Sequence, residues 1–428
     1  MQADEGPPPA RSARGGVLRQ RGFRALFGAD VVSQAGTEVG AFALPVLAVT
    51  VLHAGPREMG WLTAAGTAAF LVLGLPAGAL VDRWSPRRVL VVNDLLRAAL
   101  LATVPLAWAL DVLTLPQLYA VALAVGACTV FFDVAYQSVL PQLVGPEDLV
   151  EANARLQGVA STAQVAGPAA AGGLLRLVHP AVLVGLDAAS FLLGALLLRG
   201  VRPRPRERSA GPGRQLRAEI AEGLRFVGGH RSLRRIAATT AVANLFGTAA
   251  MSMLPLLLLR ELGLAPSTVG LLYTAGALGG LLGAVGAGPV TRVLGLGGAL
   301  LATTAASAVA GAAYPLTALT SLVGVQVGLV VVGGVVGSFA VVVYNIAQVS
   351  YRQRLCPPEL LGRMNASIRF VVWGTMPLGG LLGGALGERL GVVPTMTVAA
   401  VGAALGLLPL VHGSWWRTVS ASSPAPEM

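Results

Sequence analysis

The chain has 428 residues, of which 54% are apolar and only 12% are charged, whereas a soluble domain has about 25% charged residues. Its net charge of +11 comes from 31 basic residues, all of them Arg, against 20 acidic residues. A nucleic-acid-binding protein needs a polar basic surface, which this composition does not supply. The composition therefore excludes a set of soluble domains and indicates a polytopic membrane protein.

Apolar stretches of the length that a helix needs to span a bilayer, about 20 residues, occur twelve times. The first six lie near residues 27–52, 60–80, 89–110, 115–140, 156–177 and 180–198. The second six lie near residues 236–259, 268–290, 295–315, 322–350, 365–387 and 393–411. We therefore expect an all-α polytopic membrane protein with twelve transmembrane helices in two six-helix bundles.

The only long polar segment divides the chain in the middle. The expected parts are a cytoplasmic tail (1–24), a first bundle (25–198), a cytoplasmic linker (199–235), a second bundle (236–412) and a cytoplasmic tail (413–428). Within the linker, apolar residues recur at helical spacing, which predicts an amphipathic helix at the inner membrane surface. They are Leu216, Ile220, Leu224 and Val227. We interpret this helix as a tether between the halves; a regulatory surface is the alternative.

The Arg residues are distributed asymmetrically between the two sides of the membrane. Two of the 31 fall inside spans and four fall in the odd-numbered loops, which leaves 25 for the tails, the linker and the even-numbered loops. The four are Arg57, Arg176, Arg260 and Arg389. Because cytoplasmic segments are rich in Arg, both termini are predicted to be cytoplasmic.

The two halves of the chain share a sequence pattern. The first copy reads Tyr136…Pro146-Glu147…Asn153-Ala154, and the second reads Tyr344…Pro358-Glu359…Asn365-Ala366. Six spans per copy make the two repeats parallel, related by an axis along the membrane normal. Such symmetry is typical of transporters that rock two bundles around a site at the membrane midplane.

The loop after the second span carries a motif with a known counterpart. It reads Gly78-Ala-Leu-Val-Asp82-Arg83-Trp-Ser-Pro-Arg87-Arg88 and is similar to the G-x-x-x-D-R…R-R signature of the major facilitator superfamily. The resemblance implies that Gly78, Asp82, Arg83, Arg87 and Arg88 form a conformational lock in the outward-facing state. Ser85 and Pro86 depart from the usual Gly-Arg, and a plain cytoplasmic loop is the alternative.

The fifth span contains Gly167-Pro168 and Gly172-Gly173, similar to the G-P-x-x-G-G motif of drug:proton antiporters but one residue longer. Its small residues allow close helix packing and its Pro allows a bend. Four further phrases together resemble a bacterial efflux branch that includes the enterobactin exporter and macrolide-efflux proteins. They are Phe132-Asp133-Val-Ala, Leu149…Ala152-Asn153, Asp187-Ala-Ala-Ser-Phe191 and Glu222-Gly-Leu-Arg-Phe-Val.

This resemblance implies the major facilitator fold and the export of an amphipathic small molecule such as a drug, a macrolide or a siderophore-like compound. It implies exchange for protons and a location in the inner membrane of a bacterium, as a monomer among membrane lipids without a cofactor. A non-transporting sensor and a lipid or lysolipid flippase on the same fold are the alternatives. Only the resemblance favours export over import.

Charges inside the spans are candidates for function, because a charge near the bilayer centre costs about 2.5–3.5 kcal/mol. We identify Glu38, Asp94, Arg97, Asp133, Asp187 and Arg369. Glu38 and Asp133 are the proton-coupling candidates, with a structural hydrogen bond or a water-exposed lip as the alternatives. Asp94 and Arg97 are spaced to neutralise each other on one helix face. Arg369 is expected to reach the cytoplasmic interface, with a role at the inner gate as the alternative.

The resemblance implies that spans 1, 4, 7 and 10 line a central cavity. Polar residues on these spans are the substrate-cavity candidates, with hydrogen bonding between helices as the alternative. They are Gln34, Gln137, Asn244, Tyr344 and Asn345. The fourth span lacks the Arg that many drug antiporters carry there.

Catalytic chemistry has no support in the sequence. The four His residues lie apart at span ends, and no Cys, His and carboxylate spacing suggests a metal site. The phosphate-binding motif G-x-x-x-x-G-K-[ST] is missing too, so this chain is not expected to use ATP. We expect neither an enzyme nor a bound metal.

Overall fold

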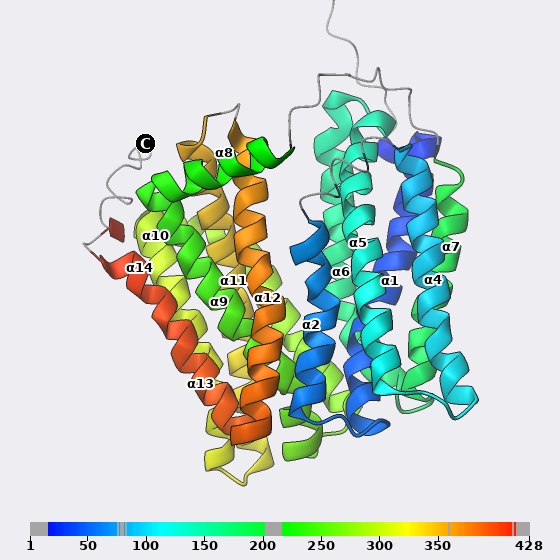
Figure 1. Cartoon of the computed structure of the whole chain (residues 1–428), viewed down its shortest axis with the longest axis vertical. Coiled ribbons are helices and arrows are strands. Elements are labelled where there is room, and N and C mark those ends of the chain that lie inside the picture. The colour runs from blue at the N-terminus through cyan, green and yellow to red at the C-terminus, as the bar shows by residue number, and fades with distance from the viewer. Residues whose placement is uncertain are drawn as a thin grey trace, which may run out of the picture.

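The computed structural model describes residues 16–74, 77, 81, 84–201, 216–357, 360–412 and 415–416. Every regular element within these residues is helical, and the helices form two bundles (Figure 1). Three residues of the predicted lock, Gly78, Asp82 and Arg83, lie outside the described residues. So do Pro358 and Glu359 of the internal repeat and most of both predicted tails.

Six long helices make up the N-terminal bundle. They are α1 (Arg21–Thr50), α2 (Pro56–Leu73), α4 (Pro86–Ala109), α5 (Leu115–Leu143), α6 (Leu149–Leu174) and α7 (Pro180–Leu198). Three of them begin with Pro, which suits the first helical position because its missing N–H has no partner there. The bounds of α7 coincide with the sixth predicted span.

The C-terminal bundle follows the same plan. It contains α9 (Arg231–Leu256), α10 (Pro266–Leu316), α11 (Val323–Leu355), α12 (Leu361–Leu390), α13 (Val392–Ala404) and α14 (Leu408–Val411). The ribbon of α10 combines two spans, because Gly295 has a φ of 68°, a value that breaks the helix and favours glycine. With α10 counted as two and α13 with α14 as one, the described part of the chain has twelve transmembrane helices, as predicted.

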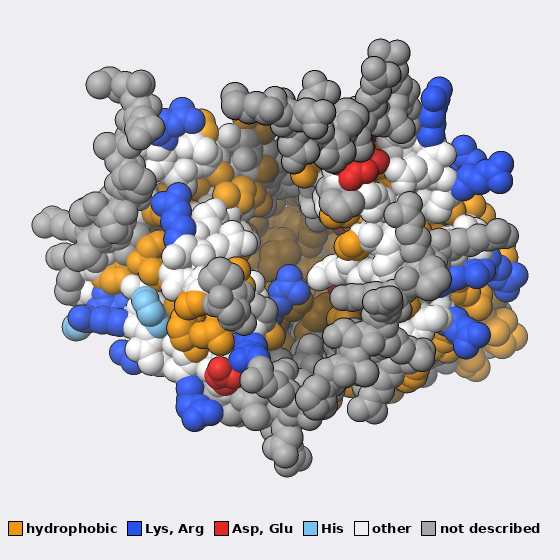
Figure 2. Space-filling model, turned by 90° about the horizontal axis from the view of Figure 1, so that it is seen from above, with side chains coloured by type: hydrophobic (Ala, Val, Ile, Leu, Met, Phe, Trp, Pro, Cys, Tyr) orange, Lys and Arg blue, Asp and Glu red, His pale blue; other side chains and the backbone are white. Residues whose placement is uncertain are grey.

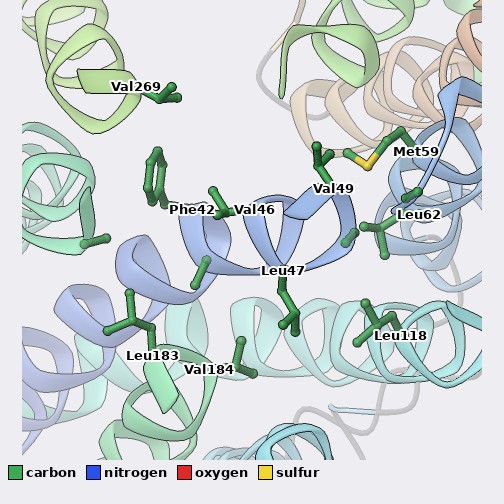
Figure 3. Close-up of a cluster of buried hydrophobic side chains, with 14 of the residues drawn as sticks. Phe42, Val46, Leu47, Val49, Met59, Leu62, Leu118, Leu183, Val184 and Val269 are labelled. Atoms are coloured by element: carbon green, nitrogen blue, oxygen red, sulfur yellow. The ribbon is translucent and has the colours of Figure 1, made fainter. Parts of the chain in front are cut away.

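The apolar core is continuous at one end of the molecule and divided at the other. Opposite α8, one cluster unites both bundles: Phe42 and Leu47 of α1 belong to it together with Val269 of α10 (Figure 3). At the end that carries α8, the clusters are confined to single bundles, around Phe23 and Leu90 in one and around Ile236 and Leu300 in the other. The apolar cluster that the two bundles share therefore lies at one end only.

The linker helix α8 (Leu216–Gly229) lies across the end of the C-terminal bundle (Figure 1). Its Glu222 accepts a hydrogen bond of 2.6 Å from Arg363 of α12, and its Val227 is buried in a cluster with Met364 and Ile368. The predicted helix is present, and its described side chains pack against α12. The side chains of Leu216, Ile220 and Leu224 lie outside the described part of the structure.

Candidate functional site

A cavity of about 780 Å³ lies between the two bundles. Seen from the end that carries α8, it is a hollow with hydrophobic side chains in its depth (Figure 2). Its walls come from α2 and α5 of the first bundle and α12 of the second. The residues that line it are Phe70, Gly74, Val130, Asp133, Val134, Gln137, Ser138, Pro141, Gln142, Asn365, Ala366, Arg369, Phe370 and Trp373.

Aromatic rings from both bundles meet in this cavity. The rings of Phe70 (α2) and Trp373 (α12) are edge to face with centroids 5.1 Å apart. The Arg369 guanidinium lies 5.2 Å from the centroid of Trp373, a cation–π arrangement. The wall is therefore apolar and aromatic with a cation at its surface, which suits an amphipathic ligand.

Two polar candidates, Asp133 and Gln137, are exposed to the cavity from α5. Asp133 is near enough to Arg369, on the α12 wall, for the two charges to interact. Arg369, for which we predicted a position at the cytoplasmic interface with an inner-gate role as the alternative, lies on the cavity wall opposite a carboxylate from the other bundle.

Behind the α5 wall is a smaller cavity of about 120 Å³ inside the N-terminal bundle, which we call the chamber. Asp133 lines both cavities. The other residues that line the chamber are Leu26, Ala29, Asp30, Ser33, Gln34, Thr37, Asp94, Arg97, Thr129, Phe132, Tyr136, Phe191 and Leu198. The predicted cavity residue Gln34 faces this chamber and is not among the residues that line the large cavity.

Arg97 is the fixed cation of the chamber. It forms the ion pair with Asp94 that the sequence predicts, and both side chains are buried. Its guanidinium also lies 4.2 Å from the ring centroids of Phe132 and Phe191, which hold it from two sides. A buried guanidinium with these partners is a rigid electrostatic anchor.

Asp30 is a functional candidate that the sequence analysis missed. It lies in α1 within the first predicted span, and its carboxyl is within hydrogen-bonding reach of Tyr136 and Gln34. The available signal was its spacing of four residues from Gln34, which places both on one helix face. Asp187 of α7 accepts a hydrogen bond of 3.4 Å from Ser190 and packs against Gly40 of α1.

Glu38 lies in α1 and contacts α6 rather than lining either cavity described above. A Cβ built on Gly167 would be 2.4 Å from the Glu38 Cβ, so this glycine makes room for the Glu38 side chain. The side chain is half-buried. The structure therefore separates the two proton-coupling candidates, because Asp133 faces the cavity and Glu38 faces the α1–α6 contact.

The other predicted cavity residues lie in the C-terminal bundle. Asn244 of α9 donates to the Val372 carbonyl of α12 at 3.0 Å, which is a bond between helices. The Tyr344 hydroxyl is buried and lies 2.8 Å from the Thr240 hydroxyl. Asn345 is exposed on α11. None of the three is among the residues that line the large cavity.

The glycine motif of the fifth span lies at the contact between the bundles. A Cβ on Gly172 of α6 would be 2.9 Å from the Pro266 carbonyl oxygen, whereas a Cβ on Gly173 would meet open space. A Cβ on Gly270 of α10 would be 2.3 Å from the Pro168 carbonyl oxygen. The motif thus allows the backbones of α6 and α10 to touch.

Part of the predicted lock is visible at the start of α4. Ser85 caps the helix by accepting a hydrogen bond from the Arg88 amide, and Pro86 follows at the first helical position. These roles explain the departure from the usual Gly-Arg. Arg87 donates to the backbone carbonyl of Arg199, at the end of α7. Arg87 therefore ties the loop to its own bundle.

The model of the Major Facilitator Superfamily matches residues 26–379, and the chain belongs to this family. It is therefore a multi-pass integral membrane transporter that handles small molecules, and not an enzyme. Among the described residues, no group of three His, Cys, Asp or Glu side chains is placed to hold a metal ion.

Relatives and solved structures agree with this assignment. The chain is 30% identical to the multidrug efflux pump Tap of Mycobacterium tuberculosis over 401 residues, which cover 89% of this chain and 90% of Tap. The nucleoside transporter NupG has a TM-score of 0.72 at 13% identity, covering 93% of this chain and 98% of NupG. An inward-facing bacterial homologue of ferroportin has a TM-score of 0.73 at 19% identity, covering 94% and 100%.

Proposed function

We propose that the protein exports an amphipathic small molecule by alternating access in exchange for protons. The observation that carries the proposal is the uneven core: the bundles share one apolar cluster at one end and enclose a cavity at the other. A transporter that rocks two bundles needs this arrangement in one of its two states.

The Arg distribution supports an inward direction of opening. The end that carries α8 also carries Arg19, Arg21, Arg24 and Arg87, and we propose that it is cytoplasmic. The cavity then opens inward, where an efflux substrate enters. The two bundles also resemble the inward-facing ferroportin homologue (TM-score 0.73) more than an outward-facing one (0.60).

Substrate class is supported by the cavity wall and by a relative. Aromatic rings from both bundles supply apolar contact, while Asp133, Gln137 and Arg369 supply polar partners. Tap, the relative at 30% identity, is named as a multidrug efflux pump. A wide, mixed wall of this kind suits varied amphipathic compounds better than one small polar metabolite.

Proton exchange is proposed to involve Asp133 and Glu38. Asp133 faces both the substrate cavity and the chamber, so protonation there changes the charge that a substrate meets. Glu38 contacts α6 at Gly167, so protonation there affects the packing of α1 on α6. We therefore infer that protonation of Asp133 is coupled to substrate binding and that protonation of Glu38 is coupled to the conformational change.

A panel of labelled amphipathic compounds in inverted vesicles tests this function. We expect uptake into the vesicles that stops when an imposed pH gradient is collapsed. Asp133→Asn and Glu38→Gln should insert normally and lose gradient-driven uptake. Asp111→Asn is the matched control, because Asp111 is exposed in the α4–α5 loop with a φ of 55°, which Asn tolerates.

Two outcomes would favour the alternatives. Binding of a compound without accumulation indicates a sensor, and movement of labelled lipid between leaflets without drug uptake indicates a flippase. Uptake that is unchanged in both acidic variants would remove these two residues from the mechanism.

A further inference from the structure

Unsatisfied polar atoms concentrate around the chamber. Among the described residues, seven buried side-chain atoms have no hydrogen-bond partner, and four of them belong to residues that line this one cavity. The four are Asp30 Oδ2, Ser33 Oγ, Asp94 Oδ2 and Arg97 Nε. Asp94 is fully buried and Ser33 is 9% exposed. Because an unpaired buried polar group is costly, this concentration points to a polar ligand inside the chamber.

Water is the ligand that fits the space. A polar cavity needs about 10–15 Å³ to hold one water molecule. The chamber offers about 120 Å³ and is bordered by four bundle helices, α1, α4, α5 and α7. Several water molecules therefore fit, and the four unpartnered oxygen and nitrogen atoms are polar contacts for them, in addition to the contacts that the water molecules make with one another.

The charges around the chamber do not balance. Asp30, Asp94 and Asp133 line it with Arg97 as the only basic side chain among its lining residues. Arg97 is committed to Asp94 by the ion pair and to two aromatic rings. Asp133 also faces Arg369 across the large cavity, whereas Asp30 has no further basic side chain among the residues that line the chamber. A carboxylate that is away from bulk water and lacks its own cation favours the protonated form, so Asp30 is the candidate to hold a proton and Asp133 is the candidate to exchange it with the large cavity.

The Asp30 and Asp133 carboxyls differ in position. Asp133 borders the large cavity as well as the chamber, whereas Asp30 borders the chamber alone. Tyr136 also lines the chamber, and its hydroxyl reaches the Asp30 carboxyl. A path of water and hydroxyl groups can therefore run from the cavity past Asp133 to Asp30.

We propose that the chamber is hydrated and that Asp30 is a proton carrier which exchanges protons with the substrate cavity through Asp133; this rests on the proposed proton-coupled export. The proton leaves the Asp30 carboxyl for a chamber water, passes to the Asp133 carboxylate and from there to water in the cavity. No covalent bond other than O–H is made or broken. In this scheme protonation of Glu38 is coupled to the packing of α1 on α6, and Asp30 holds the transported proton.

Other titratable groups near Asp30 must be separated from it in any test. On its own helix Glu38 faces α6. The neighbouring helices contribute Asp94, Arg97, Asp133, Tyr136 and Asp187. Asp187 is held by Ser190 and by the α1 glycines and is not among the chamber-lining residues.

Infrared spectroscopy of the reconstituted protein, with pH as the variable, tests the inference. We expect a protonated-carboxyl component that disappears as pH rises, is missing from the spectrum of Asp30→Asn and is present in that of the Asp111→Asn control. Asp30→Asn should retain substrate counterflow, which needs no net proton movement, and should lose gradient-driven uptake by at least about tenfold. Tyr136→Phe removes one hydroxyl and should shift the pH at which this component disappears.

The outcomes separate this inference from the proposed function. If wild-type uptake is independent of the pH gradient, the proposed function fails, and the infrared titration still decides whether Asp30 binds a proton. If Asp30→Asn keeps both this component and full gradient-driven uptake, Asp30 is not the carrier. If Asp30→Asn fails to fold, Asp30→Glu takes its place: a displaced titrating component supports the inference, and an unchanged component contradicts it.

Discussion

Gly60 of α2 lies directly against Gly384 of α12: a Cβ built on Gly60 would be 2.5 Å from the Gly384 Cα. Backbone therefore meets backbone across the two bundles at the end opposite the cavity mouth. The same kind of contact joins α6 to α10 through Gly172 and Gly270. Such packing acts only at short range, so a rocking motion of the two bundles can break all of these contacts together.

Gly172→Ala should weaken the closed end. The added methyl group would lie 2.9 Å from a backbone oxygen that has no side-chain freedom to move away. Overpacking costs about 1–3 kcal/mol, so the ratio of the inward-open to the outward-open state should fall by about 5- to 150-fold. Spin labels at Leu177 and Glu261, both exposed at this end, measure the change as a longer distance in pulsed electron resonance.

Gly173→Ala is the matched control for that variant. It adds the same methyl group one residue further along α6, where nothing lies within 4 Å. The label distance should match that of the parent protein. Equal lengthening in both variants would mean that general helix properties, and not the α6–α10 contact, set the equilibrium.

The ion pair at the same end should matter much less than the glycines. Arg57 and Glu388 join α2 to α12 at 3.5 Å, but their side chains are 61% and 52% exposed. Exposed pairs contribute about 0–1 kcal/mol. Glu388→Gln should therefore leave the label distances nearly unchanged, and opening comparable to that of Gly172→Ala would show that charge holds this end together.

Loss of the chamber's cation should destabilise the whole N-terminal bundle. Arg97→Met leaves Asp94 buried without its partner, a change that costs about 3–5 kcal/mol. Chemical unfolding of the purified protein in detergent measures the loss. The double variant Asp94→Asn/Arg97→Met should recover part of it, because no uncompensated charge remains. Arg87→Met, at an exposed cap, is the control and should cost far less.

His179 should make stability depend on pH. It lies just before α7, stacks on Trp108 with ring centroids 4.1 Å apart, and its Nδ1 accepts a hydrogen bond from the Ala181 amide. Burial lowers the pKa of His179 below its ordinary value of 6.5. The unfolded chain therefore binds the proton more tightly, so this contribution is complete above about pH 6.5 and is lost as pH falls through the folded pKa.

Melting temperatures between about pH 5 and 8 check this dependence. His179→Asn keeps a capping side chain and should remove the His179 contribution to the slope. A slope that persists in His179→Asn would assign the pH dependence to another group.

The fold was predictable because the apolar stretches and the Pro residues that begin helices agree in position. Pro56, Pro86, Pro180 and Pro266 start helices close to where the apolar stretches begin. The break between the eighth and ninth spans was predicted between residues 290 and 295, because it separates two apolar stretches, and the structure places it at Gly295. The structure shows why that residue suits it, since the positive φ there is one that glycine adopts without strain.

The site was less predictable, because the role of each of its residues depends on which faces of the helices meet. The spacing of Asp94 and Arg97 predicted their ion pair, but the rings of Phe132 and Phe191 come from two other helices. Sequence likewise does not distinguish an Asn that bonds a neighbouring helix, as Asn244 does, from one that lines a cavity. Asp30 was missed although its position in the first span was visible.

Proton movement in proteoliposomes with a trapped pH dye tests the central proposal most directly. A transported amphipathic compound is added on one side, with no imposed pH gradient, and the internal pH is recorded. Proton-coupled efflux predicts that protons move opposite to the compound, and that Asp133→Asn abolishes this movement while Asp111→Asn preserves it. Transport of the compound by the parent protein with no change in internal pH would contradict it.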